Sequence, residues 1–209
     1  MTAAADRPAG SMRIPRTMTP LGAPIELVVI GASLGGLEAL QVLLTRLPPE
    51  LPPIVVVLHR AADMSDGLGT LLGERCSLPV VEPDDKTAIV KGHVYLAPGD
   101  YHLLVERGWF SLSSDGPVRY ARPSIDVLLE SAADAYRSKL LALLLTCAST
   151  DGVNGAIAVR RTGGRVLVQE PNEARSPILP QAVIDAGVAN LIAPLEDLRR
   201  ETIRLCLGA

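Results

Sequence analysis

Residues 26–39 read ELVVIGASLGGLEA, and this stretch decides the fold. It begins with a continuous apolar, β-branched run, which is typical of a strand buried on both faces. A glycine-rich turn follows, and the stretch ends in residues with helical spacing. A strand, a tight turn and a helix in this order form the start of a parallel α/β unit. The turn itself could bind a phosphate group or expose Ser33 as a nucleophile.

The alternation of buried strands and amphipathic helices continues along most of the chain. Further apolar runs predict strands at 53–59, 79–83, 140–146, 165–170 and 188–194. Periodic segments predict helices at 36–47, 66–76, 124–137, 153–163, 177–187 and 195–207. The first of these helices is expected to stop at Pro48, and Ser124 is placed to act as an N-cap.

Residues 92–114 differ from this pattern. Short alternating segments there are interrupted by Pro98-Gly99 and Arg107-Gly108, which is typical of a β-hairpin. We therefore predict an α/β fold: a doubly wound, mostly parallel sheet flanked by helices, with an antiparallel β-hairpin insert.

Composition bounds the organisation of the chain. A length of 209 residues, 48% of them hydrophobic, suits one domain with a substantial core. Residues 1–24 are small, polar and proline-containing, and we expect a flexible N-terminal tail there, followed by a domain over 25–209. No apolar run has membrane-spanning length and the N-terminus lacks a signal-peptide core, so we expect a cytoplasmic protein without membrane insertion.

Charge and cysteine content exclude several classes of function. A net charge of -3 provides no basic surface for nucleic acid, and 3% aromatic residues do not favour base stacking. Cys76, Cys147 and Cys206 are few and widely spaced, which indicates neither a disulfide framework nor a zinc site.

Three interpretations compete for the glycine-rich turn at 31–36. A P-loop requires a longer loop ending in Lys-Ser or Lys-Thr, and the turn has no lysine. A dinucleotide turn requires glycine at position 33 and an acid after the second strand, but Ser33 and His59 stand there. The third interpretation is Gly-x-Ser-x-Gly, a tight strand-to-helix turn that exposes the hydroxyl. A packing turn with an N-capping serine remains open beside it.

The placement of three residues favours the nucleophile interpretation. Ser33 ends the first strand, His59 ends the second, and Asp151 follows the strand at 140–146. The carboxyl ends of parallel strands meet at one sheet edge, so a hydrolytic triad can converge there. Asp151 could also cap the helix at 153–163, and His93 and His102 are expected to be ordinary polar residues of the hairpin region.

Several motifs in the same order resemble a known family, over about 25–194. They are VVIGASLGGLEAL, VVVLH, VYLAPGDYHLLV, RPSIDVLLESAA and GGRVLVQEP, with LLLT and Asp151-Gly152 between the last two. Together they are similar to the catalytic domain of the CheB protein-glutamate methylesterases of bacterial chemotaxis.

This resemblance implies an enzyme and assigns its residues. It implies a Ser-His-Asp hydrolase in which Ser33 is the nucleophile, His59 the general base and then acid, and Asp151 the orienting carboxylate. The family hydrolyses γ-methyl esters of glutamate on chemoreceptor cytoplasmic helices, releases methanol, and in some members deamidates receptor glutamines. It implies no metal and no organic cofactor. The backbone N–H groups of Ala148 and Leu34 are the expected oxyanion donors.

The chain also departs from the family pattern. The family usually carries a phosphorylated receiver domain before the esterase domain. About 24 residues precede the first strand here, so we expect an enzyme that is either unregulated by phosphorylation or controlled by a partner. Leu-Thr-Gly-Met-Gly-x-Asp-Gly becomes Leu-Thr-Cys147-Ala148-Ser149-Thr-Asp151-Gly, and losing two glycines could forbid the backbone conformation of the oxyanion donor. Leu34 stands where threonine often follows the serine.

Three functions follow as hypotheses. The first is a methylesterase acting on methylated chemoreceptor helices. The second is a catalytically weak esterase-like domain that binds chemoreceptor helices or a methyltransferase, which the Cys147–Ser149 departure favours. The third is a general small-ester hydrolase.

Overall fold

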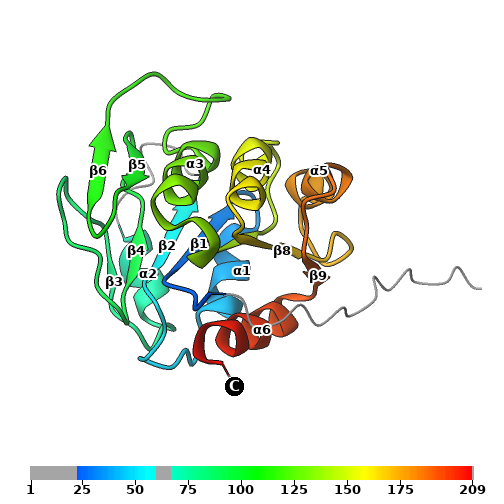
Figure 1. The fold of residues 1–209 in the computed structure, drawn as a ribbon, viewed down its shortest axis with the longest axis horizontal. Coiled ribbons are helices and arrows are strands. Elements are labelled where there is room, and N and C mark those ends of the chain that lie inside the picture. Colours follow the sequence, from blue (N-terminus) through cyan, green and yellow to red (C-terminus); the bar gives the residue numbers. More distant parts are fainter. Residues whose placement is uncertain (1–22, 60–66, 209) are drawn as a thin grey trace, which may run out of the picture.

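The computed structural model describes residues 23–59 and 67–208, so nearly all of the predicted tail at 1–24 lies outside the described residues. Seven parallel strands form one sheet in the order β3-β4-β2-β1-β7-β8-β9, and β5 and β6 form a separate antiparallel pair (Figure 1). Helices cover both faces of the large sheet. The predicted doubly wound α/β architecture is confirmed.

The elements have the following bounds. The strands are β1 (Leu27–Ala32), β2 (Ile54–Leu58), β3 (Val80–Val81), β4 (Val94–Leu96), β5 (His102–Val105), β6 (Phe110–Ser113), β7 (Leu140–Leu144), β8 (Arg165–Gln169) and β9 (Leu191–Ala193). The helices are α1 (Gly36–Leu43), α2 (Leu68–Gly73), α3 (Ile125–Tyr136), α4 (Val153–Arg161), α5 (Ile178–Asp185) and α6 (Leu195–Leu207), with a 3₁₀ turn η2 (Arg137–Lys139).

The central strands are buried on both faces because two separate apolar cores meet them. In β1, Leu27 and Val29 face the core that contains α3, α4 and α5, whereas Val28 and Ile30 face the core that contains α1, α2 and α6. Successive side chains of a strand point to opposite faces, so a strand between two cores must be apolar throughout. This is why the strands could be recognised as continuous apolar runs.

Helix α1 ends four residues earlier than expected. Leu44 is its C-cap, and Arg46 takes a left-handed conformation with φ 53°. The hydroxyl of Thr45 donates to the carbonyl of Gln41 at 2.5 Å, which gives the last turn a local side-chain partner. The backbone therefore leaves the helix before Pro48 is reached.

The expectation of an antiparallel insert over 92–114 is wrong for its first part. Residues 94–96 form β4, which pairs in parallel with β2 and β3 and is fully buried. Only β5 and β6 are antiparallel, with His102 opposite Ser113. A short buried apolar segment has no periodicity that distinguishes a parallel strand from a hairpin strand.

The chain topology creates a switch point at the carboxyl edge of the sheet. Neighbouring strands β1 and β7 lead into helices on opposite faces, α1 and α4. Such a switch point is where open α/β sheets bind ligands. Among the described residues no helix is long and apolar enough to span a bilayer.

Candidate active site

The turn after β1 holds Ser33 at the carboxyl edge of the sheet. The Ser33 N–H donates to the carbonyl of Thr146 at 3.0 Å, and its own carbonyl accepts from the N–H of Gly36 at 2.7 Å. Gly35 is the N-cap of α1 and has φ 78°, a conformation that favours glycine. Gly31 leaves no room for a side chain, because an added Cβ would lie 2.5 Å from Cγ2 of Ile125. Both flanking glycines of the motif therefore have a structural cause.

His59 follows β2 and lies beside this turn. The parallel register pairs Ala32 with Leu58, and the His59 N–H donates to the carbonyl of Ala32 at 2.9 Å. The residues next in each strand, Ser33 and His59, are thus neighbours at one edge. Among the described residues no hydrogen bond joins the Ser33 hydroxyl to the His59 ring.

His59 and Asp151 are joined directly, although 92 residues separate them in sequence. Nε2 of His59 lies 2.8 Å from Oδ2 of Asp151. The His59 side chain is 13% exposed and that of Asp151 is 0% exposed. A charged carboxylate accepts, so Nε2 carries the proton and Nδ1 is the nitrogen left for other chemistry.

Asp151 is held by the N-terminus of α3 rather than by its own helix. Its Oδ2 accepts from the N–H of Ile125 at 2.7 Å, and its Oδ1 accepts from the N–H of Asp126 at 3.1 Å and the hydroxyl of Ser124 at 2.8 Å. The expectation that Asp151 caps the helix at 153–163 is wrong, because Gly152 is the N-cap of α4. Instead, Asp151 stabilises the exposed N–H groups and positive end of the neighbouring helix.

Asp126 completes a reciprocal arrangement that sequence reasoning missed. Its Oδ1 accepts from the N–H groups of Gly152 at 2.9 Å and Gly155 at 2.8 Å, at the start of α4. Asp126 of α3 therefore caps the N-terminus of α4, and Asp151, in the turn before α4, caps the N-terminus of α3. Oδ2 of Asp126 is buried without a hydrogen bond among the described residues, and the nearest cation is Nε of Arg119 at 3.6 Å. The one sequence signal for this role is that Asp126 is an acid in the first turn of the helix predicted at 124–137.

The electrostatics keep Asp151 ionised and favour a charged His59. Burial alone raises the pKa of Asp151, but the hydrogen bonds from His59, Ile125, Asp126 and Ser124 outweigh it and the pKa is lowered. Burial alone lowers the pKa of His59, but the hydrogen bonds with Asp151 and Cys147 and the charge of Asp151 raise that pKa to about 9. Burial raises the pKa of Asp126, which has fewer compensating donors.

The departure at Cys147–Ser149 does not impose the backbone strain we expected. None of these three residues has a positive φ. The backbone N–H of Cys147 donates to the carbonyl of Ser176 at 3.1 Å, and the Ser176 hydroxyl donates to the Cys147 carbonyl at 3.1 Å. The next N–H, of exposed Ala148, has no acceptor among the described residues. The same holds for the N–H of Leu34, whose side chain is 47% exposed.

Thr146 links the turn after β1 to the loop that contains Ser176, a role that the sequence analysis did not predict. Its hydroxyl donates to the carbonyl of Leu34 at 2.7 Å and accepts from the N–H of Ser176 at 2.9 Å. Its own N–H donates to the side-chain oxygen of Gln169 at 2.8 Å. One buried threonine thus fixes the spacing of three loops at the sheet edge.

The other two histidines have structural contacts. His102 is buried, its Nδ1 accepts from the N–H of Ser124 at 3.2 Å, and its Nε2 therefore donates to the carbonyl of Gly116 at 3.1 Å. His93 lies 3.0 Å from the carbonyl of Lys91 through Nδ1. Within the described ranges no three His, Cys, Asp or Glu side chains are grouped as metal ligands would be.

The fold and this edge together define a class of protein. A doubly wound α/β sheet presents a serine at a strand-to-helix turn, a histidine bonded to a buried carboxylate, and two backbone N–H groups without an acceptor among the described residues. Groups of these kinds are the ones that serine-dependent acyl transfer uses.

The comparisons with known proteins identify the family. The chain matches the CheB methylesterase family over residues 28–202 and belongs to that family. A protein of Leptospira interrogans, provisionally named a protein-glutamate methylesterase/protein-glutamine glutaminase, is 37% identical over 86% of this chain and 94% of its own length. A Trichodesmium erythraeum protein of the same name is also 37% identical, but the match spans 53% of that longer protein.

A solved structure agrees with the fold. The catalytic domain of the Thermotoga maritima CheB methylesterase superposes with a TM-score of 0.83 at 33% sequence identity. The match covers 88% of this chain and all of that domain.

Proposed function

We propose that this protein is a serine hydrolase that removes γ-methyl esters from glutamate side chains of chemoreceptor polypeptides and releases methanol. The observation that carries the proposal is the 2.8 Å contact between His59 Nε2 and a fully buried, ionised Asp151 at the same sheet edge as Ser33. The names of the relatives supply the glutamate methyl ester, and the resemblance to the chemotaxis family supplies the chemoreceptor polypeptide.

In this mechanism Ser33 Oγ attacks the ester carbonyl carbon while His59 removes its proton. Nδ1 accepts that proton, since Nε2 is committed to Asp151. The Asp151 carboxylate stabilises the imidazolium that forms. The carbonyl oxygen becomes an oxyanion, and the N–H groups of Ala148 and Leu34 donate to it.

The remaining steps restore the enzyme. The tetrahedral intermediate collapses, the bond to the methoxy oxygen breaks, and His59 gives its proton to the departing methoxide to form methanol. Water, deprotonated by His59, then attacks the acyl group on Ser33. Glutamate leaves with a free carboxylate and Ser33 regains its proton. The same steps on a glutamine amide release ammonia, which would account for the second activity in the relatives' names.

The test is methanol release from a methylated chemoreceptor cytoplasmic fragment. The native chain is compared with Ser33→Ala and with Ser138→Ala, a matched control whose exposed serine lies before β7, at the opposite edge of the sheet. We expect release by the native chain and by Ser138→Ala, and none by Ser33→Ala. No release by the native chain, with its fold intact, would contradict the proposal and favour a binding role for the domain.

A further inference from the structure

A strained two-residue turn lies between β6 and α3. The N–H of Val118 donates to the carbonyl of Ala121 at 3.1 Å, and the N–H of Ala121 donates back at 2.8 Å. The two central residues, Arg119 and Tyr120, have φ values of 47° and 64°. Turns of this type normally hold asparagine and glycine, because other side chains disfavour positive φ. Two consecutive outliers therefore need an explanation, and such strain is often found at functional positions.

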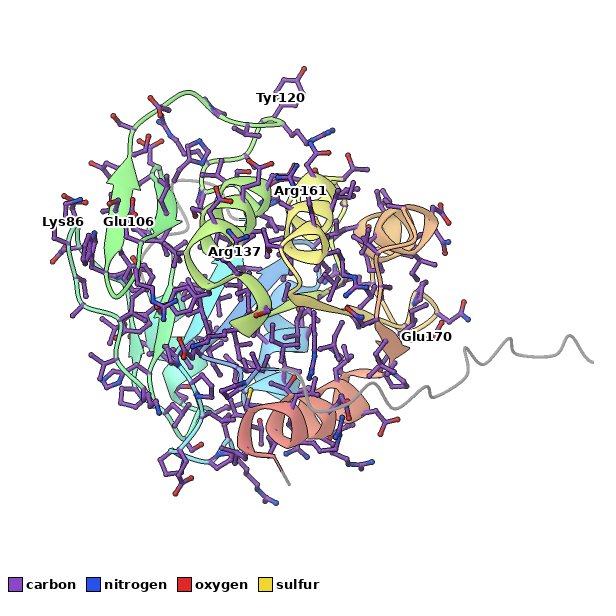
Figure 2. All side chains as sticks on the ribbon, viewed as in Figure 1. Lys86, Glu106, Tyr120, Arg137, Arg161 and Glu170 are labelled. Atoms are coloured by element: carbon purple, nitrogen blue, oxygen red, sulfur yellow. The ribbon has the colours of Figure 1, made fainter. Side chains whose placement is uncertain are left out.

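Packing does not explain the strain. Tyr120 has a relative exposure of 103%, so its ring touches almost nothing else in the molecule. In Figure 2 it projects from the loop above α3, away from the body of the protein. The chain has four tyrosines, and two of the others, Tyr95 and Tyr136, are buried as expected for large apolar rings.

Two arginines fasten the turn. Nη1 of Arg119 donates to the Thr150 hydroxyl at 3.3 Å, and its Nε lies 3.6 Å from Oδ2 of Asp126. On the other side, Arg122 bonds to Asp100 and donates through Nη1 to the carbonyls of Ser114 and Asp115 at 3.0 and 3.1 Å. The turn is thus held in place by charged hydrogen bonds.

These contacts join the turn that carries Tyr120 to the residues around Asp151 of the candidate active site. Thr150 immediately precedes Asp151, and Asp126 caps the helix that follows Asp151. Four residues after Tyr120, the Ser124 hydroxyl donates to Asp151 itself. The turn that carries Tyr120 is therefore bonded to residues that neighbour or hold the Asp151 carboxylate.

We propose that Tyr120 is a substrate-docking residue that contacts the chemoreceptor polypeptide beside the methylated glutamate. The inference rests on the proposed function and names a contact that recognises its polypeptide substrate. The proposed substrate is a side chain of a polypeptide, so the flanking polypeptide must lie across the protein surface around Ser33. A tyrosine on a turn whose backbone is held gives a large contact area and has only two side-chain torsions to fix on binding. Exposed tyrosines of this kind are frequent energetic centres of interfaces.

The experiment compares a polypeptide substrate with a small ester that carries no polypeptide. Methanol release from the methylated chemoreceptor fragment and hydrolysis of p-nitrophenyl acetate are measured for the native chain, Tyr120→Ala and Tyr120→Phe. For Tyr120→Ala, we expect kcat/KM on the fragment to fall about tenfold relative to kcat/KM on the small ester, mostly through KM. Tyr120→Phe, which keeps the ring, should restore most of the preference.

The matched control is Trp109→Ala. Trp109 is a 45% exposed aromatic residue in the loop between β5 and β6, at the end of this hairpin away from His102 and Gly116. Its removal should leave the ratio of the two kcat/KM values as in the native chain. A Tyr120→Ala chain that keeps the native ratio, or loses both activities equally, would overturn the docking role.

A binding measurement separates this inference from the proposed function. Fragment binding is compared between Ser33→Ala and the double variant Ser33→Ala/Tyr120→Ala, which requires no catalysis. Binding that weakens about tenfold in the double variant supports docking even if the native chain releases no methanol. Equal binding, or no binding by either variant, contradicts it.

Discussion

Two turns at the same sheet edge differ in the exposure and hydrogen bonding of their polar side chains. In the turn between β1 and α1, Ser33 is partly exposed and uses only its backbone to hold the turn. In the turn between β7 and α4, Asp151 is fully buried and four donors surround its carboxylate. A reacting hydroxyl must be available, whereas an orienting carboxylate must stay still and charged. The difference in environment matches the difference in proposed role.

The difference between Ser33 and Asp151 also predicts which substitutions affect activity alone and which affect stability as well. Removing the Ser33 hydroxyl leaves no buried group unpaired. Removing the Asp151 carboxylate leaves the N-terminus of α3 and the His59 ring without their acceptor. Substitutions at the two positions should therefore be distinguishable by measuring both hydrolysis and unfolding.

The largest expected effect is on Ser33. Ser33→Ala should lower kcat by about 10⁶-fold, because the nucleophile is lost, as in a comparable serine hydrolase. Its free energy of unfolding should stay within about 0.5 kcal/mol of the native value. Single-turnover ester hydrolysis and urea unfolding measure the two quantities. A variant with appreciable residual hydrolysis would show that another group is the nucleophile.

Asp151→Asn should affect both properties. We expect kcat to fall about 10⁴-fold, since an amide presents the wrong hydrogen-bond partner to His59. The amide nitrogen cannot accept from a backbone N–H, so the free energy of unfolding should also fall by about 1–3 kcal/mol for the donor left unpaired. Kinetics and urea unfolding on one preparation measure both effects. Loss of activity at native stability would mean that the bonds to α3 are not stabilising.

The backbone donor after β7 should have an intermediate effect. Ala148→Pro removes the N–H, and we expect kcat to fall roughly 10²-fold if this group donates to the oxyanion. Ala148→Met changes only the side chain and is the matched control. Steady-state hydrolysis of p-nitrophenyl acetate measures both. Equal rates for the two variants would place the donor elsewhere, for example at Leu34.

The pH dependence should reflect the raised pKa of His59. The proposed general base is the neutral imidazole of His59, and a pKa of about 9 means that the ring is mostly protonated at neutral pH. Activity should therefore rise about tenfold per pH unit and level off near pH 9. Cys147→Ala removes one of the contacts that raise this pKa and should move the midpoint to lower pH. A midpoint that does not move would show that Asp151 alone sets it.

The raised pKa of His59 also affects the stability of the folded protein. The folded-state pKa of His59 lies above its ordinary value of 6.5, so the charged ring stabilises the folded protein. That contribution is fully present below about pH 6.5 and is lost as the pH rises through about 9. Thermal unfolding of the native chain and His59→Gln across this range measures it: their difference in stability should shrink at high pH.

Local pattern was sufficient for most elements. The apolar run at 53–59 and the periodic segment at 195–207 predicted β2 and α6, the latter with the bounds observed. Ser124 is the N-cap that its position before an apolar periodic segment predicted. These predictions succeed because burial and capping depend on neighbours within a few residues. The end of α1 and the pairing of β4 were missed because they depend on a competing side chain and on strands distant in sequence.

The sequence by itself determined the parallel strands other than β4, and with them the edge at which Ser33, His59 and Asp151 lie. Only the tertiary structure decided what each side chain does there. Asp126 could be read as an ordinary acid in a first helical turn, and Asp151 as a cap of its own helix. Their actual partners lie about 25 residues away along the chain. Hydrogen bonds across that separation form only when α3 and α4 pack side by side, which no local pattern encodes.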